Sequence, residues 1–314
     1  MTITFEDVES ARRRLKGIIN ETPIISDEKL SAAIGCKAYL KAECLQRGGS
    51  FKVRGAYNKI SRLSEEEKQR GVVTASAGNH AQGVALAAKL VGVKATIVLP
   101  EFAPLTKIAA TKALGAQVIL RGDSFDAAVA YSRELEAEKG FTYVHAFDDP
   151  LIIAGQGSIG CEIAKALPDV SVVLVPIGGG GIASGVAIAL KSLIPTVRVI
   201  GVQAANVPSI NQSLRAGVPL EAIGRPTIAD GIAVKRPGIL TLPIIHEYVE
   251  SVVEVTEEEL AAGVFHCVQN AHIVAEGAGA AGVAALLAGK LKIKPEDVVC
   301  AILAGGNIDG NLLS

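Results

Sequence analysis

Residues 172–190 read VVLVPIGGGGIASGVAIAL, and this stretch is the strongest indication of the fold class. It opens with an unbroken run of branched aliphatic residues, passes through Gly178, Gly179, Gly180 and Gly181, and continues as a run of small residues. A continuous apolar run without polar alternation is typical of a strand buried on both faces, as in a parallel sheet. The stretch therefore predicts a strand, a glycine turn and a helix within an α/β protein.

The same order repeats along the chain. Aliphatic runs at 72–76, 94–100, 116–122, 197–203 and 297–307 alternate with stretches that we expect to be helical, at 79–92, from about 104, and at 126–140. A length of 314 residues favours two lobes over one. Because no long polar linker interrupts the sequence, we expect the chain to cross between the lobes.

Composition excludes several classes of protein. The net charge of −1 lacks the basic excess that nucleic acid binding needs. Glycine, lysine or proline interrupts every apolar run before it is long enough to cross a membrane. The first residues, MTITFEDVESARRRLKG, hold acids before a basic cluster and no apolar signal core, so we expect a cytoplasmic protein.

The cysteines are scattered along the chain. There are five, without CxxC spacing and without a neighbouring histidine cluster. An odd number of scattered cysteines is typical of reduced thiols in a core, and it argues against a structural zinc site. They are Cys36, Cys44, Cys161, Cys267 and Cys300.

Three segments combine glycine with polar residues at the ends of predicted strands. The loop at 178–181 could gather backbone N–H groups at a helix N-terminus, where the helix dipole favours an anion such as phosphate. It lacks the Lys-Ser/Thr of a P-loop, and the alternative is a tight strand–helix turn. The segments TASAGNHAQG (74–83) and LAGGNIDG (303–310) are the other two. In the first, a carboxylate could bind near Ser76 and Asn79, although Asn79 could be a helix N-cap and His80 a surface residue of the first turn.

Lys52 lies in the stretch SFKVRGA (50–56), which directly follows Gly48 and Gly49. Most lysines are solvated surface charges, so Lys52 alone does not indicate chemistry.

Taken together and in this order, the motifs resemble the fold-type II pyridoxal-phosphate enzymes, most of all the threonine/serine dehydratase and serine racemase branch. The matching pieces are GSFKVRGA, SAGNHAQG, GGGGIASG and AGGNID, with AGQGSIGCEI (154–163), TIADGIAV (227–234) and EGAGAAG (276–282). They extend from about residue 20 to 310.

The resemblance implies a two-domain, tryptophan synthase β-like α/β fold. Each domain would be an open, mostly parallel sheet flanked by helices. Residues 1–47 and 145–314 would form the large cofactor-binding domain, and residues 48–144 the small one. Members of the family are typically homodimers or homotetramers.

The resemblance also implies a role for each motif toward pyridoxal 5'-phosphate. Lys52 looks like the Schiff-base lysine, and Phe51 would lie beside the cofactor ring. Asn79 would hydrogen-bond the 3′ oxygen, and Gly178, Gly179, Gly180 and Gly181 would wrap the phosphate. Glu276 would lie near the ring and the reacting centre. Ser76, Asn79 and His80, partly through backbone amides, would receive the substrate carboxylate.

The activity implied is β-elimination of L-threonine or L-serine to a 2-oxo acid and ammonia, as in the short, degradative dehydratases. The alternatives are a serine racemase, a dehydratase of another β-hydroxy amino acid, and a non-catalytic protein that binds the cofactor or an amino acid. Racemase relatives carry a serine where this chain has Ala77, and alanine cannot exchange a proton. They also bind a divalent ion where this chain has Gln203 and Ser209, so we expect no metal there.

One position departs from the family pattern. The family usually has serine or cysteine facing the pyridine nitrogen of the cofactor, where this chain has Ala304. Ala304 offers that nitrogen no hydrogen bond.

Overall fold

The computed structural model describes residues 3–310 and contains two β-sheets. The larger sheet has six strands in the order β1-β2-β10-β7-β8-β9, all parallel except β1 against β2. These strands are β1 (Ile24–Ser26), β2 (Lys37–Lys41), β7 (Val172–Pro176), β8 (Arg198–Ala204), β9 (Ser251–Val255) and β10 (Val298–Ile302).

The smaller sheet has four parallel strands in the order β5-β4-β3-β6. They are β3 (Val72–Ala75), β4 (Ala95–Leu99), β5 (Gln117–Leu120) and β6 (Thr142–Tyr143). The aliphatic runs of the sequence thus form parallel strands, and the predicted α/β fold class is confirmed.

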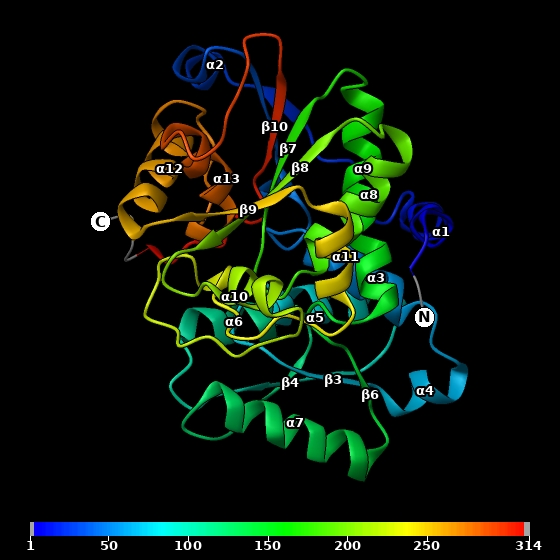
Figure 1. Cartoon of the computed structure of the whole chain (residues 1–314). Helices are drawn as coiled ribbons and strands as arrows, with labels where there is room; N and C mark the ends of the chain where they lie inside the picture. Colours follow the sequence, from blue (N-terminus) through cyan, green and yellow to red (C-terminus); the bar gives the residue numbers. More distant parts are fainter. Residues whose placement is uncertain (1–2, 311–314) are drawn as a thin grey trace.

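Helices connect the strands and cover both sheets (Figure 1). The α-helices are α1 (Phe5–Leu15), α2 (Glu28–Ile34), α3 (Lys52–Ile60), α4 (Glu65–Arg70), α5 (Asn79–Val91), α6 (Leu105–Ala113), α7 (Phe125–Lys139), α8 (Pro150–Ala166), α9 (Gly181–Leu193), α10 (Ser209–Ala216), α11 (Thr241–Tyr248), α12 (Glu257–Gln269) and α13 (Gly277–Leu287). Short 3₁₀ turns lie at η1 (Glu43–Leu45) and η2 (Asp230–Ile232). Within residues 3–310, no helix combines the length and the hydropathy that crossing a membrane requires.

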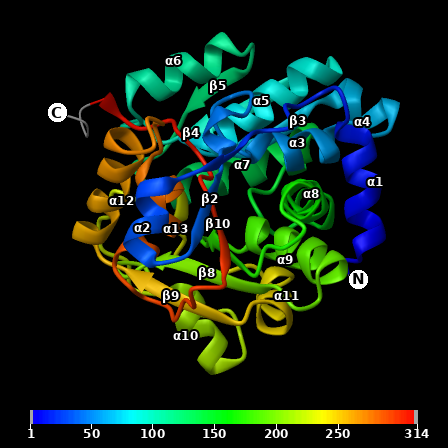
Figure 2. The ribbon, with the colours of Figure 1, turned by 90° about the horizontal axis from the view of Figure 1, so that it is seen from above.

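The strand β7 shows why its sequence does not alternate. Successive side chains of a strand point to opposite faces, so a strand covered on both sides needs apolar residues throughout. Val172 and Leu174 pack into the core beneath α12 and α13, whereas Val173 and Val175 pack into the core beneath α8 and α9. In Figure 2, α13 and α9 lie on opposite sides of this sheet.

The smaller sheet is covered in the same way. Val73 and Val98 pack against α7, and Val72 and Ile97 pack against α3 and α5 on the other face. Figure 1 shows α7 below this sheet and the larger sheet above it, so α3 and α5 lie between the two sheets.

A glycine of α5 lets α3 come close at its first residue. A Cβ atom added at Gly83 would lie 2.8 Å from Cβ of Lys52. This close approach places the N-terminus of α3, and with it Lys52, between the sheets.

The strand membership supports the division into domains that we propose. The four strands of the smaller sheet all lie within residues 48–144, and the strands of the larger sheet come from both ends of the chain. The five cysteines are buried and form no disulfide, which confirms their prediction as core thiols.

Candidate active site

Lys52 lies where the loops after several parallel strands meet. Its Nζ donates a 3.0 Å hydrogen bond to the carbonyl of Ala146, in the loop after β6, and lies 5.1 Å from the centroid of the Phe51 ring. No ion pair to Lys52 forms within residues 3–310. The lysine is therefore not the solvated surface charge that most lysines are.

The surroundings of Lys52 favour its uncharged form. Burial lowers the pKa of Lys52 to about 8, and the nearby carboxylate of Glu276 opposes part of that shift. With that pKa, about one tenth of the amines are unprotonated at pH 7, far more than for an ordinary lysine. An unprotonated amine can attack a carbonyl carbon.

The glycine loop lies between β7 and α9. Gly180 has φ of 99°, a left-handed conformation that favours glycine, and it is the N-cap of α9. No N–H group of Gly178–Gly181 donates to another atom among the described residues. Free N–H groups at the N-terminus of a 13-residue helix are suited to an anion.

One side chain connects this loop to Lys52. Phe147 follows Ala146, whose carbonyl accepts from Lys52, and it packs against the loop. A Cβ atom added at Gly179 would lie 2.3 Å from Cδ1 of Phe147, and one at Gly181 would lie 2.9 Å from its Cα. The glycines are thus required for packing as well as for backbone conformation, and the turn and anion-site interpretations are compatible.

A hydrogen-bonded chain of three polar side chains lies on another side of the site. Nδ2 of Asn79 donates to Oε1 of Glu276 at 2.5 Å, and Oδ1 of Asn79 accepts from Nδ2 of Asn307 at 2.8 Å. The Asn307 amide also donates to the carbonyl of Gly48 at 2.9 Å. An amide nitrogen carries two hydrogens, so Asn79 keeps one donor for a further partner.

Glu276 is buried, with 5% of its surface exposed. Burial raises its pKa to about 7 and nearby Asp230 adds to this, against the hydrogen bond from Asn79 and the charges of Lys107 and Lys52. A carboxyl group with this pKa can hold or release a proton near neutral pH.

The segment after the last strand, β10, contacts the site at Phe51. The Phe51 N–H donates to the carbonyl of Ala304 at 3.1 Å, and Ser50 forms a bridge with Gly305. Ala304 is 5% exposed and belongs to an apolar cluster that also contains Phe51 and Ile302. The side chains of Phe51 and Ala304 thus give this part of the site an apolar character.

Two of the readings offered for residues 79 and 80 are wrong. Asn79 is the first residue of α5 and not its N-cap, which is Gly78. His80 is no surface residue: it is 5% exposed, and its Nε2 contacts Oγ1 of Thr74 and the carbonyl of Val144. Burial lowers the pKa of His80 to about 3, so its ring is neutral.

Ser76 lies in the turn between β3 and α5. Its Oγ accepts the N–H of Gly78 at 3.2 Å, and its own N–H donates to the carbonyl of Val98. The residue is half-buried.

Gln203 lies in β8 and Ser209 is the first residue of α10, and both side chains contact other protein groups. Oε1 of Gln203 accepts the N–H of Ile210 at 3.1 Å, and its Nε2 donates to Glu254 at 3.0 Å. The Ser209 hydroxyl donates to the carbonyl of Val234 at 2.6 Å. Both side chains are thus engaged in hydrogen bonds to protein atoms.

The loop at residues 145–148 was not predicted to belong to the site. It supplies the carbonyl that accepts from Lys52 and the ring that packs on the glycine loop. Nδ1 of His145 accepts two N–H groups, from Phe147 at 3.2 Å and Asp148 at 2.8 Å. The available signal was the short run FTYV (141–144) directly before HAFDDP (145–150), which was not predicted as a strand and which the structure shows to contain β6.

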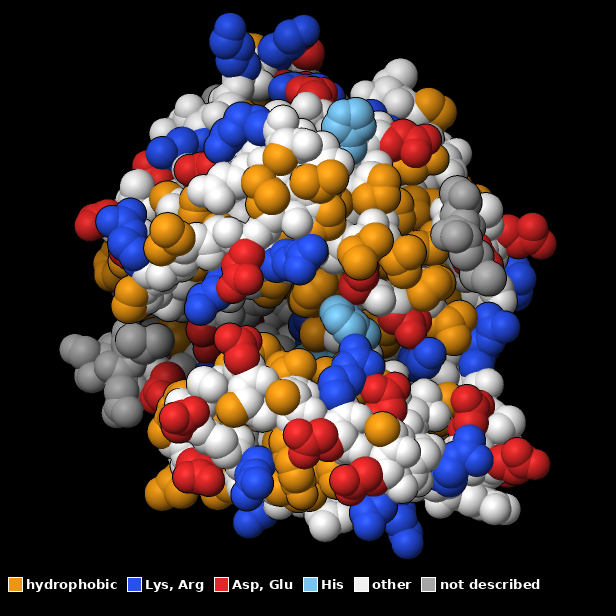
Figure 3. All heavy atoms as spheres, turned by 60° about the horizontal axis from the view of Figure 1, so that its bottom comes forward, with side chains coloured by type: hydrophobic (Ala, Val, Ile, Leu, Met, Phe, Trp, Pro, Cys, Tyr) orange, Lys and Arg blue, Asp and Glu red, His pale blue; other side chains and the backbone are white. Residues whose placement is uncertain are grey.

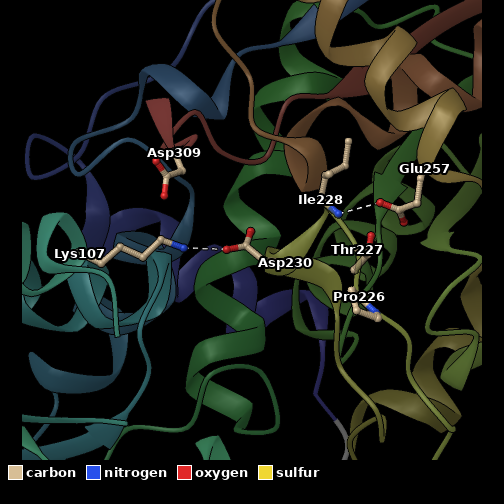
Figure 4. A pocket seen from close by; sticks show the side chains of 7 residues that line it. All are labelled: Lys107, Pro226, Thr227, Ile228, Asp230, Glu257 and Asp309. Carbon is tan, nitrogen blue, oxygen red and sulfur yellow. Dashed lines mark hydrogen bonds and ion pairs between the residues drawn. The ribbon is translucent and has the colours of Figure 1, made fainter. Parts of the chain in front are cut away.

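Charged residues lie along the edge of a hollow in the molecular surface. Figure 3 shows a hollow between the two parts of the molecule, with acidic and basic side chains along its edge. Nζ of Lys107, on α6, pairs with Oδ2 of Asp230, on η2, at 2.7 Å. This pair lines a cavity of about 430 Å³ (Figure 4), to which Glu257 and Asp309 also contribute. The pair joins elements that lie beside different sheets.

Two mostly parallel sheets, a lysine with a lowered pKa between them, and a glycine loop whose N–H groups are free for an anion are features suited to an enzyme that uses a phosphorylated aldehyde as its cofactor. The comparisons with known proteins agree. Residues 15–305 match the family model described as pyridoxal-phosphate dependent enzyme, and the chain belongs to this family.

Similar proteins match over nearly the whole chain. It is 54% identical over 311 residues to the L-threonine ammonia-lyase of Thermotoga maritima, covering 99% of this chain and 77% of that one. It is 46% identical over 310 residues to the catabolic L-threonine dehydratase TdcB of Staphylococcus aureus, covering 98% and 90%. Among solved structures, maize serine racemase has a TM-score of 0.95 at 33% identity, covering 100% of this chain and 96% of that one.

The residues of this site fit pyridoxal phosphate. An amine with a pKa of about 8 is available for an aldehyde, and free N–H groups are available for a phosphate. The apolar side formed by Phe51 and Ala304 suits one face or edge of an aromatic ring.

Proposed function

We propose that this enzyme catalyses β-elimination of L-threonine or L-serine, releasing a 2-oxo acid and ammonia. The observation that carries the proposal is the amine of Lys52, which forms no ion pair within residues 3–310 and whose pKa is lowered by burial, in a chain 54% identical to a named L-threonine ammonia-lyase. Both the lysine and the loops around it are intact.

Pyridoxal phosphate, when bound, supplies an electron sink for the electron pair left at the substrate Cα. We assign its binding to Lys52, to the glycine loop for the phosphate, to Phe51 beside the ring, and to the spare donor of Asn79. Glu276 accepts from Asn79 and so orients the amide. Ala304 leaves the ring nitrogen without a partner from that position.

Lys52 is the base in this proposal. Its amine takes the Cα proton of the substrate, and its lowered pKa keeps an unprotonated fraction available at neutral pH. The Cβ–O bond breaks, and the hydroxyl takes up one proton and leaves as water, which balances the proton that Lys52 removed from Cα. The enamine that remains takes up water and loses ammonia to give the 2-oxo acid.

The substrate carboxylate is assigned to the turn before α5. Ser76 and the first N–H groups of the helix, at Asn79 and His80, are the donors. The His80 ring is buried against Thr74 and Val144, so its backbone amide and not its imidazole contributes.

Serine racemisation is the second candidate, favoured by the TM-score of 0.95 with maize serine racemase. A racemase needs a second proton carrier across the substrate from Lys52, and Ala77 cannot be one. Incubating the cofactor-loaded enzyme with L-threonine and L-serine, without added metal, tests both candidates. We expect 2-oxo acid and ammonia in equal amounts. Formation of D-serine from L-serine without 2-oxo acid would show that the enzyme catalyses racemisation and not elimination.

We also propose a homodimer or homotetramer that works in the cytoplasm. Five buried free thiols support a reducing compartment. Light scattering of the purified holoenzyme tests the oligomeric state, and a monomeric mass would refute that part.

A further inference from the structure

The carbonyl of Gly179 is anchored from outside the glycine loop. It accepts the hydroxyl of Thr241 at 2.6 Å and the N–H of Gly238 at 3.2 Å. The same hydroxyl accepts the Gly238 N–H at 3.1 Å, and Thr241 is completely buried. One threonine thus fixes the direction of this carbonyl.

The direction of the carbonyl determines the direction of the next N–H. A trans peptide is planar, so its C=O and N–H bonds point to opposite sides. With the Gly179 carbonyl directed at Thr241, the Gly180 N–H is directed to the opposite side. That N–H donates to no atom of the described residues.

Asp148 holds the segment that carries Thr241. Its carboxylate accepts three successive backbone N–H groups, from Ile239 at 3.0 Å, Leu240 at 2.9 Å and Thr241 at 3.3 Å. The helix α11, which begins at Thr241, has no side-chain cap of its own, so Asp148 takes that role. A Cβ atom added at Gly238 would lie 2.1 Å from Oδ1 of Asp148, which explains the glycine there.

We propose that Thr241 and Asp148 are positioning residues for the cofactor phosphate. Asp148 holds the start of α11, Thr241 holds the Gly179 carbonyl, and the Gly179–Gly180 peptide thereby presents its N–H to the phosphate. This inference rests on the proposed function, in that it takes the glycine loop as the phosphate site.

The proposal separates two parts of cofactor binding. Thr241 and Asp148, together called the brace, act on the phosphate end of the cofactor only, whereas Lys52 bonds to its aldehyde end. Pyridoxal, which lacks the phosphate, therefore serves as the matched ligand. Losing the brace should weaken binding of pyridoxal phosphate and leave binding of pyridoxal unchanged.

The test compares four variants of the full-length apoenzyme. Thr241→Val removes the hydroxyl at nearly constant shape, and Thr241→Ser keeps it. Asp148→Asn removes the charge that faces three N–H groups, and Asp149→Asn is its matched control, because Asp149 caps α8 and pairs with Lys59 instead. Binding of pyridoxal phosphate and of pyridoxal is titrated by cofactor absorbance, and borohydride reduction followed by mass spectrometry checks attachment at Lys52.

We expect Thr241→Val and Asp148→Asn to raise the Kd for pyridoxal phosphate about three- to tenfold, the range for one lost hydrogen bond. The Kd for pyridoxal should stay at the wild-type value, and Thr241→Ser and Asp149→Asn should bind both ligands normally. Wild-type affinity of Thr241→Val for pyridoxal phosphate, or an equal rise in the Kd for both ligands, would overturn the proposed role of the brace. If Thr241→Val does not fold, Asp148→Asn decides alone. Equal affinity of the wild type for the two ligands would instead overturn the glycine loop as the phosphate site.

Discussion

Arg54 lies two residues after Lys52, and we expect its replacement by methionine to destabilise the folded protein strongly. Its guanidinium is fully buried and forms ion pairs with Glu43 at 2.8 Å and with Glu162 at 2.6 Å. It also donates to the Ser158 hydroxyl at 2.9 Å, and Lys41 pairs with Glu162 at 2.5 Å. Arg54→Met would leave Glu43 buried without its main partner.

The magnitude follows from burial. Removing one partner of a buried ion pair costs about 3–5 kcal/mol, because the remaining charge stays out of water. Burial alone would raise the pKa of Glu43, but Arg54 outweighs this and holds the pKa below its ordinary value. The wild-type contribution is therefore present above the unfolded pKa and is lost as the pH falls through the folded one.

In Arg54→Met, the contribution of Glu43 to stability changes with pH in the opposite direction. Without Arg54, burial is opposed only by Lys41 and Thr22, so we expect the folded pKa of Glu43 to lie above the unfolded value. The variant then loses stability as the pH rises past the ordinary glutamate pKa, so its deficit should be larger at pH 8 than at pH 5. Adding Glu43→Gln removes the buried charge and should restore part of the loss at pH 8.

Urea unfolding of the apoenzyme, followed by circular dichroism at both pH values, measures these differences. Arg198→Met is the matched control, since Arg198 pairs with Glu250 on the surface, with side chains 31% and 44% exposed. We expect it to cost less than about 1 kcal/mol. A loss for Arg54→Met as small as that of the control, or a smaller deficit at pH 8 than at pH 5, would show that Arg54 does not stabilise a buried Glu43 charge.

Three further predictions concern the cofactor site. The rate at which pyridoxal phosphate attaches to the apoenzyme should rise with pH as Lys52 loses its proton, with the midpoint of the rise at about pH 8. A rate constant in stopped-flow absorbance that does not change across this range would contradict the lowered pKa. Glu276→Gln removes a charge that raises the pKa of Lys52, so the midpoint should move to lower pH, and a shift upward would exclude that interaction. Gly179→Ala places a methyl group 2.3 Å from Phe147, and overpacking of about 1–3 kcal/mol should weaken cofactor binding in an absorbance titration; Gly310→Ala, whose Cβ atom would meet nothing within 4 Å, is the control, and equal affinities would argue against this packing.

The parallel strands could be predicted from the sequence because their signal is local. An unbroken run such as VVLV requires apolar surroundings on both faces, and β7 has them. The glycine loop was visible for the same reason, since four consecutive glycines are conformationally costly. The interpretation of Lys52 needed the family resemblance, because nothing local distinguishes it from a surface lysine.

Other features depend on contacts between distant segments. Whether His80 is on the surface is decided by Thr74 and Val144, and the sequence shows neither contact. The same holds for Asp148, which resembles an ordinary loop acid until the structure brings it to the start of α11. Partners that are far apart in the chain leave no periodicity or spacing to read.

Lys52 is proposed to carry the cofactor and to take the Cα proton in an elimination reaction. The most direct test measures 2-oxo acid release from L-threonine and L-serine by the loaded wild type, by Lys52→Ala, and by Lys59→Ala on the same helix. We predict release by the wild type and by Lys59→Ala, none by Lys52→Ala, and a borohydride-reduced cofactor label on the peptide that contains Lys52. A label on Lys52 without 2-oxo acid from either substrate would contradict the reaction, and turnover by Lys52→Ala would contradict the role of the lysine.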